Sequence, residues 1–256
     1  KALMPVFYGG GISGIDRIYE FARLNNLRVI EDAAHAFGTT HKGKKIGSFG
    51  DITCFSFDGI KNITSGEGGA VFTDDKGVLE KLKDIRLLGV QKDSEKRKKL
   101  QRSWDFDVEE QGWRYHMSSI MAAIGIEQLK RFENLSKTRQ NLAKHYSLIL
   151  SSHSNIKIID NNYNEVVPHI YPVLIEGLKY RDSLRELMLK QGIQTGVHWK
   201  PNHLLSKFFK PGTKNLPQTE LVFESLLTLP LNADMSLDDV EYVCEMLAEN
   251  LKTNEF

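Results

Sequence analysis

The first ninety residues alternate short apolar runs with segments whose apolar residues recur at helical spacing. This pattern predicts strands at residues 4–8, 27–30, 52–57 and 70–73, and helices at residues 15–24 and 78–88. Such alternation is typical of a mostly parallel sheet that helices cover on both faces. Because ligands of these sheets bind beyond the carboxyl ends of the strands, we expect an α/β domain with its site at that edge.

A second pattern begins at Ser118 and Ser119, which can cap a long helix that runs to about Leu150. Its apolar stripe comprises Ile120, Ala123, Ile124, Ile126, Leu129 and Phe132. Strands are expected next at 156–159, 170–175 and 195–199, and helices at 180–191 and 237–251. We therefore expect a large domain at residues 1–133, and an interdomain helix with a small α+β domain at residues 134–256.

Charge and composition argue against several classes of protein. The 34 basic and 33 acidic residues leave a net charge of +1, which gives no electrostatic reason to expect nucleic acid or an anionic membrane as partner. No apolar run approaches the roughly 20 residues of a membrane span. Cys54 and Cys244 are far apart and match no zinc spacing, so we interpret both as reduced core thiols of a cytoplasmic protein and expect no metal.

The residues with the most specific chemistry lie between Val29 and Asp75. Asp32 ends an apolar run, Ser56 and Lys61 follow the next one, and a glycine cluster at 66–69 comes directly after. Enzymes that use pyridoxal 5′-phosphate (PLP) need an acid at the pyridinium nitrogen, a lysine that forms an imine, and small polar residues near the phosphate. The order of these residues favours that cofactor, although each alone is common in structural roles.

Two glycine motifs suggest other nucleotide sites. Residues 9–14 match G-x-G-x-x-G, and Glu31 and Asp32 lie at about the 20-residue distance of an acid in a dinucleotide fold, so an NAD-dependent oxidoreductase is an alternative. Residues 38–45 nearly match a phosphate-binding loop, but Lys45 replaces the Mg²⁺-binding hydroxyl. We prefer a basic hairpin with Gly43 at its turn for this second motif.

Three further features allow a structural or a functional interpretation. His35 is either a core histidine or a residue that packs on the cofactor, and His198 and His203 are either loop histidines or substrate contacts. The charged segment 91–110 is either a solvated loop or a flap near the site.

Several stretches together resemble the DegT/StrS family of sugar aminotransferases over nearly the whole chain. They are Val29-Ile-Glu-Asp-Ala-Ala-His35, Lys42-Gly43 with residues 47–50, Phe55-Ser-Phe57, Lys61-Asn62, residues 66–69, residues 112–118 and residues 196–201. The combination of Glu-Asp-Ala-Ala-His with Ser-Phe and Lys-Asn is highly specific.

The resemblance implies a type I PLP-transferase fold, like that of aspartate aminotransferase, with a mostly parallel large domain and a small C-terminal α+β domain. It implies PLP as cofactor and transfer of an amino group, from glutamate, to a nucleotide-linked keto-deoxysugar in cell-surface polysaccharide or related sugar biosynthesis. The protein is then a cytoplasmic homodimer that binds no nucleic acid and no membrane.

The resemblance also implies roles for individual residues. Lys61 is the catalytic residue and carries the cofactor as an imine, and Asp32 pairs with the pyridine nitrogen. The remaining implied contacts are His35 near the ring, Ser56 at the phosphate, Arg114 at a neighbouring subunit's cofactor, and Tyr115 and His198 at the substrate.

Two departures from the family pattern accompany these roles. The family's upstream third, which supplies backbone amides for the phosphate and a residue that stacks on the ring, is expected to be missing, so the fold is N-terminally incomplete. Arg114, Tyr115 and His116 also stand where the family usually has Asn-Tyr-Arg. An inactive or split family member that serves dimerisation or regulation is therefore the second alternative.

Overall fold

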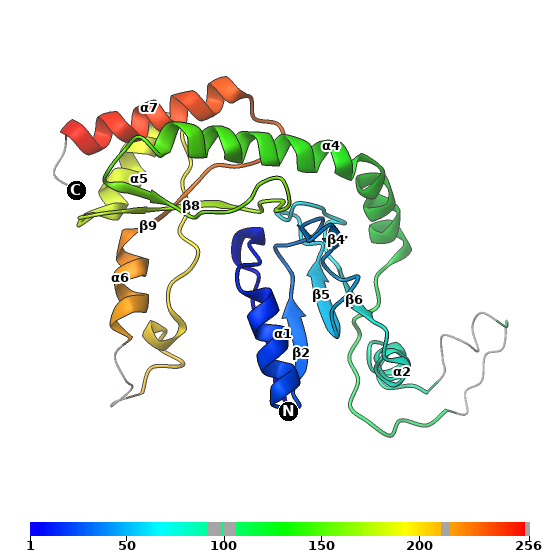
Figure 1. Ribbon diagram of the computed structural model, residues 1–256. Helices are drawn as coiled ribbons and strands as arrows, with labels where there is room; N and C mark the ends of the chain where they lie inside the picture. Colours follow the sequence, from blue (N-terminus) through cyan, green and yellow to red (C-terminus); the bar gives the residue numbers. More distant parts are fainter. Residues whose placement is uncertain (92–98, 100–105, 211–215, 254–256) are drawn as a thin grey trace. The chain divides into compact units, whose positions relative to one another are not determined.

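A computed structural model describes residues 1–91, 99, 106–210 and 216–253 of the protein (Figure 1). The chain forms two compact units. The N-terminal unit comprises residues 1–8 and 12–132, and the C-terminal unit comprises residues 9–11 and 133–256. The assignment of 1–133 to cofactor binding and of 134–256 to the helix and small domain stays a prediction. Most of the charged segment 91–110 lies outside the described residues.

The N-terminal unit is built on a sheet with the order β1-β2-β5-β6 (Figure 1). The strands are β1 (Ala2–Leu3), β2 (Arg28–Asp32), β5 (Ile52–Ser56) and β6 (Gly69–Thr73). The pairs β1–β2 and β2–β5 are parallel and the pair β5–β6 is antiparallel, which confirms a mostly parallel α/β sheet.

The first strand differs from the prediction. We expected it at residues 4–8, but β1 covers Ala2–Leu3, and Val6 makes only an isolated bridge to Asp32. Pro5 lies between Leu3 and Val6 and has no backbone N–H, so it interrupts the ladder. Only its carbonyl takes part, and it accepts a 2.9 Å hydrogen bond from the Asp32 amide.

Helix α1 (Ile15–Leu24) has the predicted bounds, and its Ile15 joins a core cluster with Ala33, Ala36 and Phe55. Helix α2 (Lys76–Ile85) begins after Asp75, whose carboxylate accepts hydrogen bonds from the backbone amides of the first turn. It ends three residues before the predicted end. The predicted basic hairpin is confirmed as β3 (Thr40–His41) and β4 (Lys44–Lys45), which a turn at positive φ connects.

Long helix α4 (Ser119–Leu150) is also confirmed, and the Ser118 hydroxyl accepts a 3.2 Å hydrogen bond from the Met121 amide at its start. The apolar stripe of its first turns is not buried as a core stripe would be. Phe132 is buried, but Ile120, Ile124, Ile126 and Leu129 are exposed. The helix therefore follows the predicted pattern while presenting apolar side chains at its N-terminal half.

The C-terminal unit contains the antiparallel sheet β7-β8-β9 and is an α+β fold, as predicted. Its strands are β7 (Ile156–Ile158), β8 (Tyr171–Ile175) and β9 (Leu226–Leu229), and its helices after α4 are α5 (Arg181–Lys190), α6 (Pro217–Ser225) and α7 (Leu237–Thr253). Two short 3₁₀ turns, η1 (Tyr8–Gly10) and η2 (Asn202–Leu204), complete the described elements.

The predicted strand at 195–199 is wrong. Gly196 exchanges two backbone hydrogen bonds with Thr228 of β9 and makes only an isolated bridge. Beyond this pair the chain leaves the sheet, because the side chain of His198 instead bonds the Thr228 hydroxyl at 3.0 Å and Trp199 turns into an exposed position.

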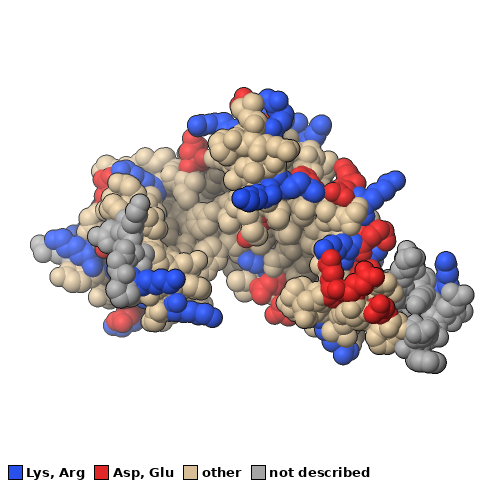
Figure 2. Space-filling model, turned by 90° about the horizontal axis from the view of Figure 1, so that it is seen from below, with Lys and Arg blue, Asp and Glu red and all other residues tan. Residues whose placement is uncertain are grey.

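Acidic and basic side chains are interspersed on the face of the protein shown in Figure 2, in keeping with the formal net charge of +1. Within the described ranges, no helix combines the length and apolar character that crossing a membrane requires.

Candidate active site

Asp32 and Ser56 end two neighbouring parallel strands, so both lie at the carboxyl edge of the sheet. The register pairs Asp32 with Cys54, and side chains alternate between the two faces along a strand. Asp32, Cys54 and Ser56 therefore share one face, whereas Glu31 and Thr53 occupy the opposite face. The Asp32 carboxylate accepts a 3.2 Å hydrogen bond from the Ala34 amide, which orients it at the start of the following loop.

Lys61 lies in the loop that leaves β5 at this same edge. Two backbone hydrogen bonds close the base of the loop, from Phe57 to the Gly68 carbonyl at 2.8 Å and from Ser65 to the Phe57 carbonyl at 2.9 Å. The Lys61 amide donates to the Asp58 carbonyl at 3.1 Å. The structure thus brings Asp32, Ser56 and Lys61 to one edge of one sheet, although 29 residues separate the first and the last in sequence.

His35 follows Asp32 in the loop after β2 and is buried, with 6% of its surface exposed. Its ring lies 6.4 Å from that of Tyr8, measured between centroids. Burial raises the pKa of Tyr8 to about 12, so its phenol stays protonated at neutral pH. His35 therefore belongs to the same edge as Asp32 and keeps both interpretations, as a core residue and as a cofactor contact.

The glycine cluster at 66–69 is tightly packed. A Cβ added to Gly68 would lie 2.5 Å from the Met117 Cε and 2.7 Å from the Ser65 Oγ, and one added to Gly69 would lie 2.7 Å from the Phe55 carbonyl oxygen. The nearby Ser65 hydroxyl is buried and donates to the Glu67 carbonyl at 2.9 Å. Close packing between β5, β6 and Met117 accounts for these glycines.

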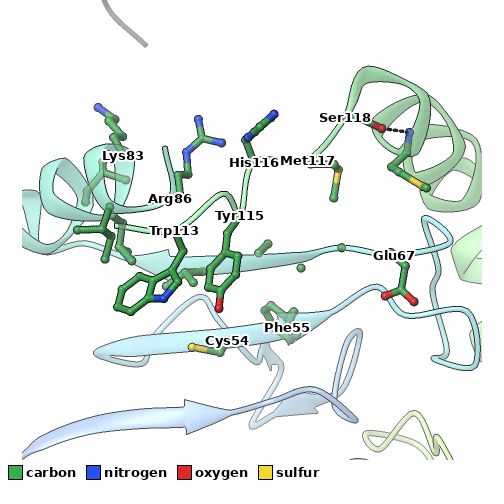
Figure 3. A pocket seen from close by; sticks show the side chains of 18 residues that line it. Cys54, Phe55, Glu67, Lys83, Arg86, Trp113, Tyr115, His116, Met117 and Ser118 are labelled. Atoms are coloured by element: carbon green, nitrogen blue, oxygen red, sulfur yellow. Dashed lines mark hydrogen bonds between the residues drawn. The ribbon is translucent and has the colours of Figure 1, made fainter. Parts of the chain in front are cut away.

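Arg114 and Tyr115 lie in an exposed segment beside α2. The Trp113 and Tyr115 amides donate to the carbonyls of Ile85 and Arg86, and the Leu88 amide donates to the Trp113 carbonyl. The Trp113 and Tyr115 rings are stacked, with centroids 5.9 Å apart (Figure 3). Arg114 forms a bridge with Leu87 on the same ladder.

This segment covers a cavity of about 950 Å³ that the sequence analysis did not predict (Figure 3). Residues of β5, β6, α2 and the start of α4 line it, with Cys54 and Val71 from the sheet and Trp113, Tyr115 and Met117 from the segment. Because Cys54 and Val71 are paired in register, the cavity lies on the sheet face that also carries Asp32. Asp32, Ser56 and Lys61 are not among its described lining residues.

Gly112 determines where this segment begins. A Cβ at this position would lie 2.0 Å from the Gly89 nitrogen and 2.3 Å from the Leu88 carbonyl carbon, so the two backbone segments can meet only at a glycine. We expect Gly112→Ala to lower the free energy of unfolding by about 1–3 kcal/mol, the usual cost of overpacking. Urea denaturation measures this change.

Gly59→Ala is the matched control, because the nearest atom to its added Cβ is the Gly66 carbonyl oxygen at 3.7 Å. Equal stabilities of the two variants would show that the close approach at Gly112 does not exist in solution.

His198 lies in the C-terminal unit, where its ring bonds Thr228 and makes an edge-to-face contact with Trp199, with centroids 4.9 Å apart. His203 has a structural role. Its ring forms a 3.0 Å hydrogen bond with Glu220, and the same carboxylate accepts a hydrogen bond from the Leu216 amide at the start of α6. The hydrogen bond from His203 holds the pKa of Glu220 below its usual range.

The glycine run at 9–14 also has a structural role. Gly9 and Gly10 adopt positive φ in η1, and the Gly9 carbonyl accepts a 3.1 Å hydrogen bond from the His169 amide. A Cβ at Gly9 would meet Ile170 at 3.6 Å. Turn formation and packing explain this motif without a dinucleotide.

Comparison with known proteins is consistent with the geometry of this edge. The model of the DegT/DnrJ/EryC1/StrS aminotransferase family matches residues 1–248. The uncharacterized protein MJ1066 of Methanocaldococcus jannaschii is 42% identical over 250 residues, which cover 94% of this chain and 64% of that protein. The UDP-4-amino-4,6-dideoxy-N-acetyl-beta-L-altrosamine transaminase of Campylobacter jejuni is 34% identical, over 96% of this chain and 64% of that enzyme.

A solved structure gives the same result for the fold. The PLP form of the putative sugar aminotransferase Spr1654 from Streptococcus pneumoniae has a TM-score of 0.84 and 28% identity, and the match covers 96% of this chain and 67% of that one. This chain spans less than two thirds of the length of the two curated relatives above, 64% in each case. The match over residues 1–248 shows that the chain belongs to the DegT/DnrJ/EryC1/StrS aminotransferase family.

Proposed function

We propose that this protein is a PLP-dependent aminotransferase that transfers an amino group, from glutamate, to a nucleotide-linked keto-deoxysugar. The observation that carries the proposal is the placement of Asp32, Ser56 and Lys61 at one carboxyl edge of the β2–β5 pair. Open α/β sheets bind their ligands at this edge. The names of the Campylobacter jejuni transaminase and of Spr1654 support the reaction and the cofactor.

The residues at this edge fit PLP by their chemistry. Lys61 supplies the amine that bonds the cofactor aldehyde, Asp32 supplies a carboxylate for the pyridine nitrogen, and the Ser56 hydroxyl is suited to the phosphate. His35, close behind Asp32, contacts the ring. When bound, PLP acts as the electron sink for the bond that breaks at the substrate Cα.

Lys61 would have a second role as a proton carrier whenever its amine is free. The free amine would take the proton from the substrate Cα and would return it on the other side of the transferred nitrogen. General acid–base catalysis of this kind contributes about 10²–10⁴-fold to the rate. Asp32 keeps the ring nitrogen protonated throughout, because a carboxylate favours the cationic form of a neighbouring base.

The remaining site residues define the assembly and the substrate. We propose a cytoplasmic homodimer in which Arg114 contributes to the cofactor site of the partner, because an exposed guanidinium can bind a phosphate bidentately. Tyr115, exposed beside Arg114, and His198 contact the nucleotide sugar. The exposed apolar residues at the start of α4 support burial of this region in an assembly.

Transfer of labelled nitrogen tests the proposed function. Glutamate carrying ¹⁵N in its amino group is incubated with the protein, PLP and a nucleotide-linked 4-keto-6-deoxysugar, and the product is analysed by mass spectrometry. We expect an aminosugar that contains the label. A sugar that loses oxygen without gaining nitrogen would contradict the proposal, and a protein that neither binds PLP nor transfers nitrogen would support the non-catalytic alternative.

A further inference from the structure

We propose that Asn62 is a positioning residue, which fastens the loop that carries Lys61 to the loop that begins at Asp32. This inference rests on the proposed function for its purpose, and on the hydrogen bonds of the N-terminal unit for its geometry. Asn62 is next to the reactive lysine in sequence, but its side chain contacts the loop that follows β2.

The contact joins two loops that are distant in sequence. The Asn62 Nδ2 donates a 3.2 Å hydrogen bond to the carbonyl oxygen of Phe37, 25 residues away. Phe37 lies in the loop that follows β2, five residues after Asp32. Asn62 is 3% exposed, so this bond is shielded from water that could replace it.

The acceptor of this bond is itself held in place. The Phe37 ring makes edge-to-face contacts with Phe55, Phe57 and Phe132, with centroid distances of 5.2, 5.8 and 5.0 Å. Such contacts are favoured for aromatic pairs and fix the orientation of a buried ring. The packed Phe37 ring therefore restrains the Phe37 carbonyl, and the hydrogen bond from Asn62 to this carbonyl restrains the Lys61 loop.

The donor side is equally constrained. Ile63, on the other side of Asn62, is buried, and the Lys61 amide is bonded to the Asp58 carbonyl. The Asp58 carboxylate in turn accepts the Ile60 amide at 3.0 Å. The Asn62–Phe37 bond ties this constrained loop to the loop after β2, so we infer that it helps to set the position of Lys61 relative to Asp32.

The function of Asn62 requires a side-chain donor. An ionised aspartate at this position has nearly the same shape but offers only acceptors, which repel the Phe37 carbonyl, and an alanine offers neither donor nor acceptor. The structure contains a matched control at Asn25, whose Nδ2 also donates to a phenylalanine carbonyl, that of Phe21, at 2.8 Å. Asn25 is exposed at the C-terminal end of α1 and is not one of the candidate site residues.

Hydrogen–deuterium exchange on the cofactor-free protein tests the geometry. We expect Asn62→Asp to accelerate exchange about tenfold in residues 33–38 and 57–65, because a buried hydrogen bond of this kind is worth about that factor. Asn25→Asp should leave both segments unchanged. Unchanged exchange in the Asn62 variant would overturn the inference. If the aspartate variant does not fold, Asn62→Ala provides the same comparison.

Covalent capture of PLP tests the purpose. Each protein is mixed with PLP, reduced with borohydride at timed intervals, and assayed for adduct at Lys61. We expect the rate of adduct formation at Lys61 to fall at least about tenfold in Asn62→Asp, because the lysine amine is no longer held in the reactive orientation. The rate for Asn25→Asp should match that of the wild type. Equal rates for all three proteins would overturn the positioning role. A wild-type protein that captures no PLP at Lys61 would instead contradict the proposed function and leave the exchange result to decide the geometry.

Discussion

Replacement of Lys61 by alanine is expected to abolish the visible absorbance that appears when PLP is added to the wild-type protein. This absorbance requires a covalent bond between the cofactor aldehyde and an amine, and the proposed function assigns that amine to Lys61. A spectrophotometric titration with PLP measures the effect. The change is all-or-none, because no other group can replace a deleted amine at the same point of the loop.

Lys44→Ala is the control for this titration. Lys44 is exposed on the hairpin strand β4 and has no place in the proposed site, so its variant should give the wild-type spectrum. If Lys61→Ala retained the absorbance at equal PLP concentration, another lysine would form the imine and the assignment to Lys61 would be wrong.

Replacement of Glu31 by alanine is expected to lower the free energy of unfolding by about 3–5 kcal/mol. Glu31 is fully buried, on the sheet face opposite to the one that carries Asp32. Its carboxyl oxygens accept hydrogen bonds from the Tyr19 hydroxyl at 2.6 Å and the Thr53 hydroxyl at 2.5 Å. Its removal leaves both hydroxyls without an acceptor and opens a cavity between α1, β2 and β5.

Burial, followed by the hydrogen bond to Glu31, raises the pKa of Tyr19 far above its usual range, so the phenol remains a donor at any pH at which the protein is studied. Glu20→Ala is the matched control, since Glu20 is exposed on the same helix. Chemical denaturation of both variants measures the difference. A Glu31 variant as stable as the Glu20 variant would show that the buried cluster contributes nothing to the fold.

Much of the architecture was predictable from local patterns. The spacing of apolar residues gave the bounds of α1 and the length of α4, and alternation of strand and helix gave the parallel β2–β5 pair. The predictions that were wrong or missing concern short elements. The first strand is displaced by Pro5, residues 195–199 form only a bridge, and neither α6 nor β9 was expected.

The site was predictable to a different extent. Asp32 and Lys61 were identified because each lies directly after an apolar run, and strands that are neighbours in a parallel sheet end at the same edge. The Asn62–Phe37 bond and the Glu31 cluster were not, because their partners are 12 to 25 residues apart in sequence. Periodicity describes which face a residue occupies and carries no information about which distant residue it meets.

The apolar cavity under Trp113 and Tyr115 was missed for the same reason. Its walls come from β5, β6, α2 and the segment 113–118. This segment is placed by the close approach of Gly112 to Gly89 and by backbone hydrogen bonds of Trp113 and Tyr115 to Ile85 and Arg86. Local patterns in the sequence identify the glycine at 112 but not the backbone that it meets.

The central claim is that the amine of Lys61 and the carboxylate of Asp32 serve one PLP molecule. The most direct test is to reduce the wild-type protein with borohydride in the presence of stoichiometric PLP and to locate the adduct by peptide mass spectrometry. The account predicts that the pyridoxyl group is found on Lys61, and that Asp32→Asn reduces its yield at that lysine. An adduct distributed over exposed lysines such as Lys42 and Lys44, with none on Lys61, would contradict it.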